Sequence, residues 1–273
     1  MGQGIATSYA QLVVDVFGVE LERIRIVMGD TDRGQGFGSA GSRSLFTAGS
    51  AINHASETAV ANGRDLAAEA LEASAADIEY VGGVFRIAGT DRGIGLFELA
   101  GRQPERRIYV DSTSKVAGPS WPNGCHITEV EVDPETGAVE IVFYVSVNDV
   151  GRVVNPMIVR GQLDGGAVQG IGQALGEQML YDPDSGQALT ASMMDYFMPR
   201  ADIIRDFVHV LDQTIPCRNN PLGVKGVGEL GTIGATPAVV NAVADALARA
   251  GHADKARTIQ MPLTPEKVWE ALR

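Results

Sequence analysis

One carboxylate stands in a glycine-rich loop near the end of the chain. Glu229 directly follows Gly228, and Gly226 and Gly231 lie close by within the segment 219–234. Small neighbours leave room beside the carboxylate for a bulky ligand, and such crowding would partly desolvate it. Desolvation raises a carboxyl pKa toward neutrality, which suits a general base. The same residues also fit an ordinary exposed turn, so the loop alone leaves both interpretations open.

A second candidate site is the segment 34–44, which reads GQGFGSAGSRS. Glycine and serine before a helix can form a nest of backbone N–H groups that binds phosphate or another anion. Arg43 would add charge-assisted hydrogen bonds to such an anion. The segment lacks P-loop spacing, and it has no GxGxxG in a strand–turn–helix setting. An anion site and an ordinary loop therefore both remain open.

A third candidate is the segment 155–180, expected to be a helix that the pair Asn155-Pro156 opens as cap and first helical residue. It contains six glycines between Gly161 and Gly176. Each interior glycine costs about 1 kcal/mol relative to alanine, so the total approaches the net stability of a domain. Two explanations stay open. Either another element packs closely on the helix, or its backbone approaches a ligand that Gln162 and Gln169 hydrogen-bond.

The elements that position these residues follow from hydrophobic periodicity and turn signals. In the first half, the pattern predicts a helix over 5–17 that Gly18 ends, a strand over 24–28 and a long helix over 44–73. It also predicts a hairpin whose strands are 78–81 and 84–88 and whose turn is Gly82-Gly83. The second half predicts strands over 128–132 and 139–148 around a turn at 133–137, and helices opened by Asn155-Pro156, Thr236-Pro237 and Thr264-Pro265. The fold class is therefore α+β, in two lobes over 1–117 and 118–273, each with helices packed on a mostly antiparallel sheet.

Composition excludes several classes of partner. The chain has 273 residues and a net charge of −12, so nucleic acid and anionic lipid are not expected partners. No apolar stretch approaches the roughly 20 residues of a membrane span, and no signal peptide is recognised at the N-terminus. The two cysteines, Cys125 and Cys217, make no disulfide framework and predict a cytoplasmic protein with reduced thiols. His54, His126 and His209 lack metal-ligand spacing and are expected to be structural.

Several segments together resemble one family. They are, in chain order, Gly2-Gln3-Gly4, Gly38–Ser44, Asn148–Arg152 with Asn155-Pro156, Gly161-Gln162 with Gln169-Gly170, Gly223–Glu229, and Thr236-Pro237-Ala238. This order is similar to the molybdopterin-binding large subunit of the xanthine dehydrogenase, aldehyde oxidase and aerobic carbon monoxide dehydrogenase family. The resemblance covers nearly the whole chain, and GVKGVGE and DVGRVVNP are its most specific parts.

The resemblance implies a cofactor and a role for each matching residue. The cofactor would be molybdopterin with molybdenum, in the cytosine dinucleotide form that bacterial relatives commonly carry. Its binding residues would be Gln3, Gly4, Ser39, Ala40, Ser42, Arg43, Ser44, Gln162 and Gly228, none of them a metal ligand. Glu229 would be the catalytic general base.

The resemblance also implies a reaction and partners. The reaction would be an oxidation that uses water-derived oxygen on an aldehyde, an N-heterocycle or a similar small substrate, and the sequence does not single out one of these. Electrons would leave through FAD-binding and 2Fe-2S iron–sulfur subunits. A homo-oligomer is also compatible with the sequence.

The chain departs from the family in its length. Family large subunits are much longer, and the missing N-terminal half is an expected partner without which this part would be inactive. A fragment, a truncated gene product and one half of a split subunit all fit this pattern. The alternative is a non-catalytic fragment or a cofactor-binding module without bound metal, and a different ligand-binding α+β protein is a third possibility.

Overall fold

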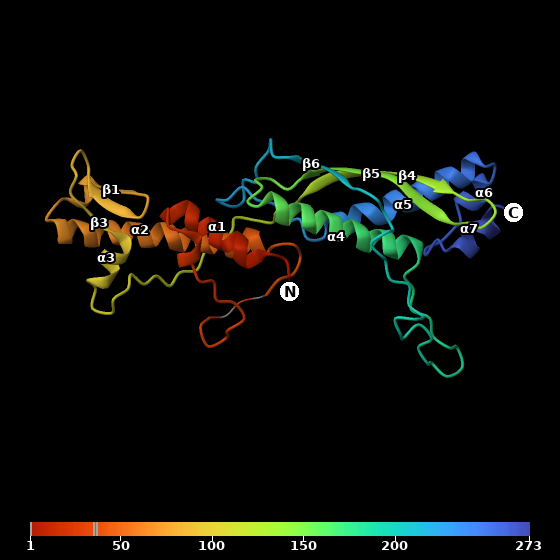
Figure 1. Ribbon diagram of the computed structural model, residues 1–273, viewed down its shortest axis with the longest axis horizontal. Helices are drawn as coiled ribbons and strands as arrows, with labels where there is room; N and C mark the ends of the chain where they lie inside the picture. Colours follow the sequence, from red (N-terminus) through yellow and green to blue (C-terminus); the bar gives the residue numbers. More distant parts are fainter. Residues whose placement is uncertain (1, 35, 37) are drawn as a thin grey trace. The chain divides into compact units, whose positions relative to one another are not determined.

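The computed structural model describes residues 2–34, 36 and 38–273, and these divide into two compact units (Figure 1). The first unit comprises Met1–Ser120 and Pro216–Val224, and the second comprises Trp121–Ile215 and Lys225–Arg273. Each unit holds helices and one three-stranded sheet, so the predicted α+β class with two lobes is confirmed. The division differs from the predicted lobes because Pro216–Val224 returns to the first unit, where Ala117 N–H donates to the carbonyl of Asn219 at 3.1 Å.

The first unit begins with helix α1 and ends with a small helix after its sheet. Its elements are α1 (Ile5–Phe17), the turns η1 (Leu21–Arg23), η2 (Leu45–Gly49) and η3 (Ala75–Asp77), α2 (Ser50–Leu71), β1 (Ile78–Val81), β2 (Val84–Ile87), β3 (Gly93–Gly95) and α3 (Leu96–Gly101). The sheet order is β1-β2-β3, with both pairs antiparallel. As predicted, Gly18 ends α1: it adopts a left-handed φ of 60°, and its N–H donates to the Val14 carbonyl.

The core of the first unit lies between α2 and the sheet. Phe85 is fully buried, and its ring lies so close to Gly63 of α2 that a Cβ there would meet it at 2.3 Å. Tyr80 stacks beside Phe85 and donates its hydroxyl to the Phe17 carbonyl at 2.8 Å. Its burial raises the pKa of the Tyr80 phenol to about 12. The sheet is thereby fixed to both α1 and α2.

The second unit packs helices on one face of a longer sheet. Its elements are β4 (Asn123–Val132), β5 (Val139–Asp149), α4 (Pro156–Leu175), β6 (Val208–Asp212), α5 (Leu230–Arg249), α6 (Ala253–Ala256) and α7 (Pro265–Ala271). The order is β4-β5-β6; β4 and β5 are antiparallel, whereas β5 and β6 are parallel. Figure 1 shows α4 and α5 lying along the sheet, and buried side chains such as Tyr144, Ile171 and Val239 fill the space between them.

Three sequence predictions about these elements were wrong or incomplete. Residues 24–28 form no strand, because no described segment pairs with them. Helix α5 begins at Leu230 rather than at Thr236-Pro237, and Pro237 lies inside it. Strands β3 and β6 were not predicted, and the parallel pairing of β6 makes the second sheet mixed. The Asn155 and Thr264 caps are confirmed: each side chain accepts a hydrogen bond from the backbone N–H three residues later.

Helix α5 also corrects the expectation about apolar length. Within the described residues, Leu230–Arg249 is long and apolar enough to cross a membrane by length and composition. Its apolar face is used inside the second unit instead, since Ala235 and Val239 pack with Ile171 of α4 and Ile141 of β5. Val243 and Leu247 continue this face into the cluster with α7. We therefore interpret α5 as a core helix.

Candidate functional site

The start of the chain and the glycine–serine loop meet within the first unit. The Gln3 amide donates to the Ser39 hydroxyl at 3.1 Å, and that hydroxyl shares a hydrogen bond of 2.5 Å with Ser44. Tyr9 of α1 donates its hydroxyl to the Ser44 carbonyl at 3.1 Å. Residues far apart in sequence are thus joined into one chain of polar groups that begins at Gln3.

The loop has a conformation suited to presenting its backbone. Gly38 and Gly41 have φ values of 86° and 60°, and Ser42 has a φ of 54°, which is uncommon for a residue with a side chain. A Cβ built on Gly38 or Gly41 would meet nothing within 4 Å, so open space adjoins the loop. The helical segment starts at Ser44, and Thr47 N–H donates to the Arg43 carbonyl at 2.8 Å. The first N–H groups of this helical segment, which have no acceptor within the helix itself, therefore lie next to the loop.

Two glycines of α4, Gly166 and Gly170, allow close packing against α5. A Cβ at Gly170 would approach Ala235 and the Thr232 carbonyl at 2.8 and 2.9 Å. A Cβ at Gly166 would approach Gly231 at 3.1 Å. The Thr232 hydroxyl donates across this contact to the Gly166 carbonyl at 2.8 Å. The packing explanation is supported at these positions.

Two other glycines of α4 have no such contact. A Cβ at Gly161 or Gly165 would meet nothing within 4 Å. Gln162, which lies between them in sequence, is half-buried. Close packing does not account for Gly161 and Gly165, so the ligand explanation remains open there.

Glu229 occupies the N-cap position of the 20-residue helix α5. Its carbonyl accepts a hydrogen bond from Ile233 N–H at 3.0 Å, and the residue is exposed. The partial desolvation expected at this carboxylate is therefore not provided by the described residues of this chain. Leu230, which follows it, is buried with Leu163 of α4. Because Gln162 adjoins Leu163, the structure brings Gln162, Gly228 and Glu229 to the same end of the α4–α5 pair.

Sequence reasoning missed the ion pair that precedes Glu229. Lys225 and Asp149 form a salt bridge of 2.5 Å, and both side chains are largely buried. Lys225 lies four residues before Glu229, whereas Asp149 ends β5. A lone lysine in a glycine loop is a weak sequence signal, because its partner lies 76 residues away.

Two histidines of the second unit, His126 and His209, lie in a polar layer beneath the helices. His126 Nδ1 and the Tyr144 hydroxyl are 2.6 Å apart, and burial lowers the pKa of the His126 imidazole. His209 contacts the Ser146 hydroxyl with Nδ1 at 2.5 Å and the Asp164 carboxylate with Nε2 at 2.8 Å. Ser146 is almost fully buried, so this Ser–His–Asp arrangement has no access to a substrate. The prediction that these histidines are structural agrees with this packing, and no group of three or more metal-ligating side chains occurs among the described residues.

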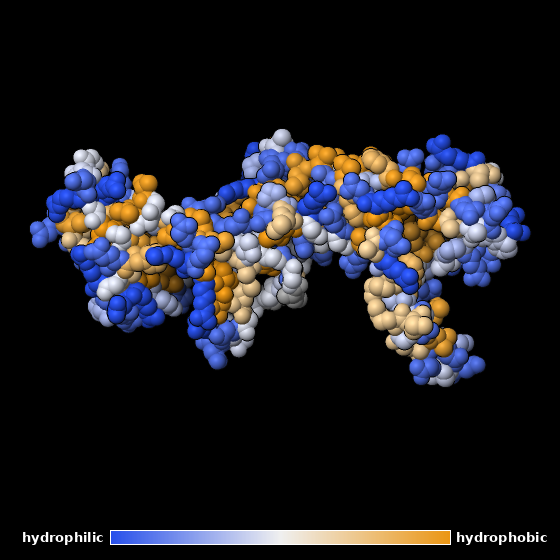
Figure 2. All heavy atoms as spheres, in the orientation of Figure 1, coloured by the Kyte–Doolittle hydropathy of each residue, from blue (hydrophilic) through white to orange (hydrophobic). Residues whose placement is uncertain are grey.

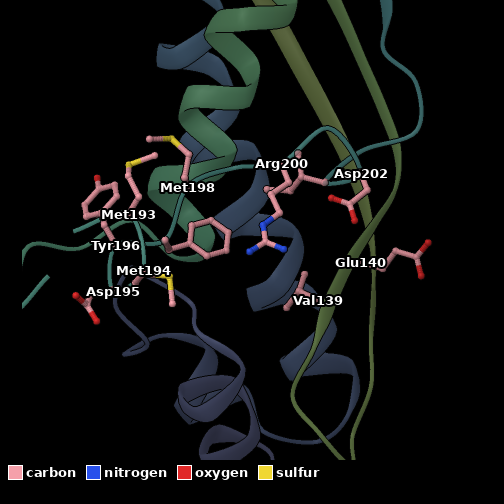
Figure 3. A pocket seen from close by; sticks show the side chains of 11 residues that line it. Val139, Glu140, Met193, Met194, Asp195, Tyr196, Met198, Arg200 and Asp202 are labelled. Atoms are coloured by element: carbon pink, nitrogen blue, oxygen red, sulfur yellow. The ribbon is translucent and has the colours of Figure 1, made fainter. Parts of the chain in front are cut away.

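Two cavities, one in each unit, lie away from the predicted residues. In the second unit, a groove of about 830 Å³ is lined by Val139, Met193, Tyr196, Met198 and Arg200 among others (Figure 3). Figure 3 shows these side chains coming from the segment 193–203 and from the start of β5. In the first unit, a second cavity lies between α2 and the segment 103–109. We place the candidate site at the loops rather than in these cavities, because the cavities hold none of the expected groups.

The fold and these loops define an α+β protein in which glycine-rich turns present hydroxyls and amides, and in which Glu229 is an exposed carboxylate at a helix start. Residues 1–205 match the family described as the molybdopterin cofactor-binding domain. The chain belongs to this family. Glu229 lies beyond the matched residues, although full-length comparisons extend over it.

Relatives of known activity are subunits of oxidoreductases. The chain is 38% identical to the 6-hydroxypseudooxynicotine dehydrogenase complex subunit gamma of Paenarthrobacter nicotinovorans, over 98% of this chain and 34% of that protein. It is 36% identical to the nicotine 6-hydroxylase large subunit of the same organism, over 100% of this chain and 34% of that one. A solved structure of the Cu,Mo-CO dehydrogenase aligns with a TM-score of 0.87 and 32% identity, over 99% of this chain and 34% of that one. The chain thus spans about a third of the length of the relatives it matches.

Proposed function

We propose that this chain supplies the cofactor-binding and general-base part of a molybdenum hydroxylase. The enzyme would oxidise an aldehyde, an N-heterocycle or a similar small substrate with oxygen derived from water. One observation carries the proposal: Glu229 is an exposed carboxylate fixed at the start of α5, beside a stretch of α4 where Gly161 has no packing partner within 4 Å. A carboxylate in that position can reach a group bound outside the helices.

The residues present fit a molybdopterin cofactor. Its phosphate needs hydrogen-bond donors, and the 38–44 loop offers serine hydroxyls, the start of a helical segment and the Arg43 guanidinium. Gln3, Gly4, Ser39, Ala40, Ser42 and Ser44 would bind the cofactor in the first unit, and Gln162 and Gly228 would do so in the second. When bound, the cofactor supplies the redox chemistry. We infer the cytosine dinucleotide form from the bacterial branch that the GSAGSRS loop resembles.

Glu229 would act as the general base. Its carboxylate would accept a proton from the water-derived O–H that attacks the substrate carbon. The cofactor and the rest of the large subunit would provide the desolvation that this chain lacks.

The missing part of the large subunit is the proposed main partner. The face of the second sheet that points away from α4 and α5 is apolar and exposed, as Figure 2 shows over the strands β4 to β6. Ile127, Val145 and Val208 lie opposite one another in one row, and Cys125, Val147 and Val210 lie in the next. Exposed apolar faces of this kind indicate interaction sites.

The electrons released by the reaction would pass to FAD-binding and 2Fe-2S subunits. We place the protein in the cytoplasm, where the thiols of Cys125 and Cys217 would stay reduced.

Replacing Glu229 by glutamine tests the general-base assignment. We expect the Glu229→Gln enzyme, purified with its partner chains, to keep its molybdenum content but to lose at least about a hundredfold in kcat, as expected for loss of a general base. The measurement combines metal analysis with steady-state kinetics on an aldehyde and on an N-heterocycle. Glu270→Gln, at an exposed position of α7, serves as the matched control.

Two outcomes would contradict the proposal. Normal turnover of Glu229→Gln would remove Glu229 from the mechanism. Absence of molybdenum from the wild-type complex, with all partners present, would favour a non-catalytic module instead.

A further inference from the structure

A buried lysine holds the loop that carries Glu229. The Lys225 side chain is only 10% exposed, and its ammonium lies 2.5 Å from the Asp149 carboxylate. The backbone is fixed at the same residue, because Lys225 N–H donates to the Val150 carbonyl at 2.8 Å. The loop is therefore bound to the end of β5 twice, once through the side chain and once through the main chain.

The acceptor is itself held in place. The second oxygen of the Asp149 carboxylate accepts a hydrogen bond from Gly151 N–H at 3.0 Å. Asp149 also lies opposite Asp212, since the two residues pair across the parallel strands β5 and β6. The Asp212 pKa is lowered chiefly by hydrogen bonds from Thr214, and Lys225 contributes least to that shift. The direct partner of the Lys225 ammonium is Asp149, and loss of the ammonium would leave that largely buried carboxylate without its counter-charge.

The segment between Lys225 and Glu229 is short and is also held at its other end. Val227 packs against the cluster of Val150 and Leu230, and Leu230 N–H donates to the Val227 carbonyl at 3.2 Å. Leu230 then begins α5, which is fixed to α4 by the glycine contacts. A five-residue segment with both ends fixed leaves its last residue little freedom, although that residue is exposed.

We infer that Lys225 is the positioning residue for Glu229, acting through its ion pair with Asp149. This inference rests on the proposed function for the role of Glu229. General-base catalysis needs the Glu229 carboxylate within hydrogen-bond reach of one proton, and the Lys225–Asp149 pair fixes the start of the five-residue segment that carries it.

The test compares three variants in the full chain with any partner chains that co-purify. Lys225→Met removes the charge, Lys225→Arg keeps it, and Asp149→Asn weakens the acceptor. Lys255→Met, at an exposed position of α6 in the same unit, is the matched control. The first readout is backbone hydrogen exchange by mass spectrometry, and the second is the separate effect on kcat and KM.

We expect the amides of residues 226–233 to exchange about tenfold faster or more in Lys225→Met, because a broken buried ion pair permits local opening. Peptides from β4 and α4 should keep their wild-type rates, which distinguishes loosening of the loop from unfolding of the unit. Lys225→Arg should exchange more slowly than Lys225→Met, and Lys255→Met should match the wild type. In the loaded enzyme, kcat should fall while KM changes little.

The inference fails if exchange of residues 226–233 in Lys225→Met equals that of the control. It also fails if that exchange rises but kcat does not fall while Glu229→Gln remains inactive. If Glu229→Gln turns over normally, the proposed function fails, whatever the exchange data show. The two failures are therefore distinguishable.

Discussion

At the scale of single residues, the environment of a titratable side chain depends on its burial and not only on its residue type. Glu229 is exposed, whereas His126 is packed between Tyr144 and Gly234, where a Cβ would meet its ring at 2.5 Å. The imidazole Nε2 of His126 is buried without a partner in the described structure. These two titratable side chains thus have opposite environments.

The burial of His126 predicts a dependence of stability on pH. Its pKa is lowered chiefly by desolvation, so the unfolded chain binds a proton that the folded chain excludes. The stability of the second unit should therefore be full above the ordinary histidine pKa of about 6.5 and should decrease as the pH falls below it. Urea unfolding at pH 7.5 and 5.5 measures this change.

A substitution separates His126 from other groups that titrate in the same range. His126→Gln should lose less stability between the two pH values than the wild type does. His252→Gln, at the start of α6, should keep the wild-type loss. Equal losses in all three proteins would show that another group causes the dependence.

At the scale of the element, α4 combines two kinds of glycine in one helix. Gly170 adjoins the backbone of α5, so a side chain there could be accommodated only if the two helices moved apart. Gly161 has open space beside it. The helix therefore offers a pair of identical substitutions with opposite expected effects.

Alanine at these positions tests both explanations of the glycine helix. Gly170→Ala should destabilise the second unit by about 1–3 kcal/mol, because the added methyl forces α4 and α5 apart. Gly161→Ala should stabilise it by up to about 1 kcal/mol through better helix propensity. Thermal or urea unfolding measures both changes.

The same Gly161→Ala protein tests ligand approach. Lower molybdopterin content in a more stable protein would support a cofactor lying against Gly161. Unchanged cofactor content would contradict ligand approach as the explanation of Gly161. A destabilised Gly161→Ala protein would contradict the open space seen beside this residue.

At the scale of the whole molecule, the chain spans a third of its relatives and exposes apolar surface on its second unit. Val147 and Val210 lie opposite each other on the outward face of the sheet, in the second of the two apolar rows. Their side chains make no part of the core between the sheet and its helices. This face can therefore be altered without disturbing the fold.

Glutamate at this face tests the proposed partner. Val147→Glu should leave the free energy of unfolding of the chain nearly unchanged but should strongly reduce co-purification with the remaining part of the large subunit. Gln187→Glu, which adds the same charge in an exposed turn, should co-purify normally. Light scattering on the chain alone tests whether the face binds a second copy of the chain instead. In that case the wild-type chain would be a dimer and Val147→Glu would be a monomer. Normal co-purification of Val147→Glu would exclude the face as the contact.

Local signals in the sequence determined much of the secondary structure. Gly18 ends α1, Gly82-Gly83 turns the first hairpin, and Asn155 caps α4, because each of these hydrogen-bonds or turns residues only a few positions away. The candidate site residues could also be named from the sequence, since glycine-rich loops and a lone glutamate are visible there. The family followed from the order of those loops.

Only the tertiary structure decided the features that depend on distant partners. Helix α5 starts at Leu230 because Gly231 packs on α4, and this contact overrides the Thr236-Pro237 signal. Strand β6 exists because β5 offers it hydrogen bonds from 63 residues away, as between Ser146 and His209, whereas residues 24–28 find no such partner among the described residues. The sequence by itself determined that Glu229 stands among glycines. The fold decided that Glu229 is exposed at the start of α5 and that Lys225, four residues before it, is buried in an ion pair with Asp149. Burial and ion pairing depend on residues that meet only after folding.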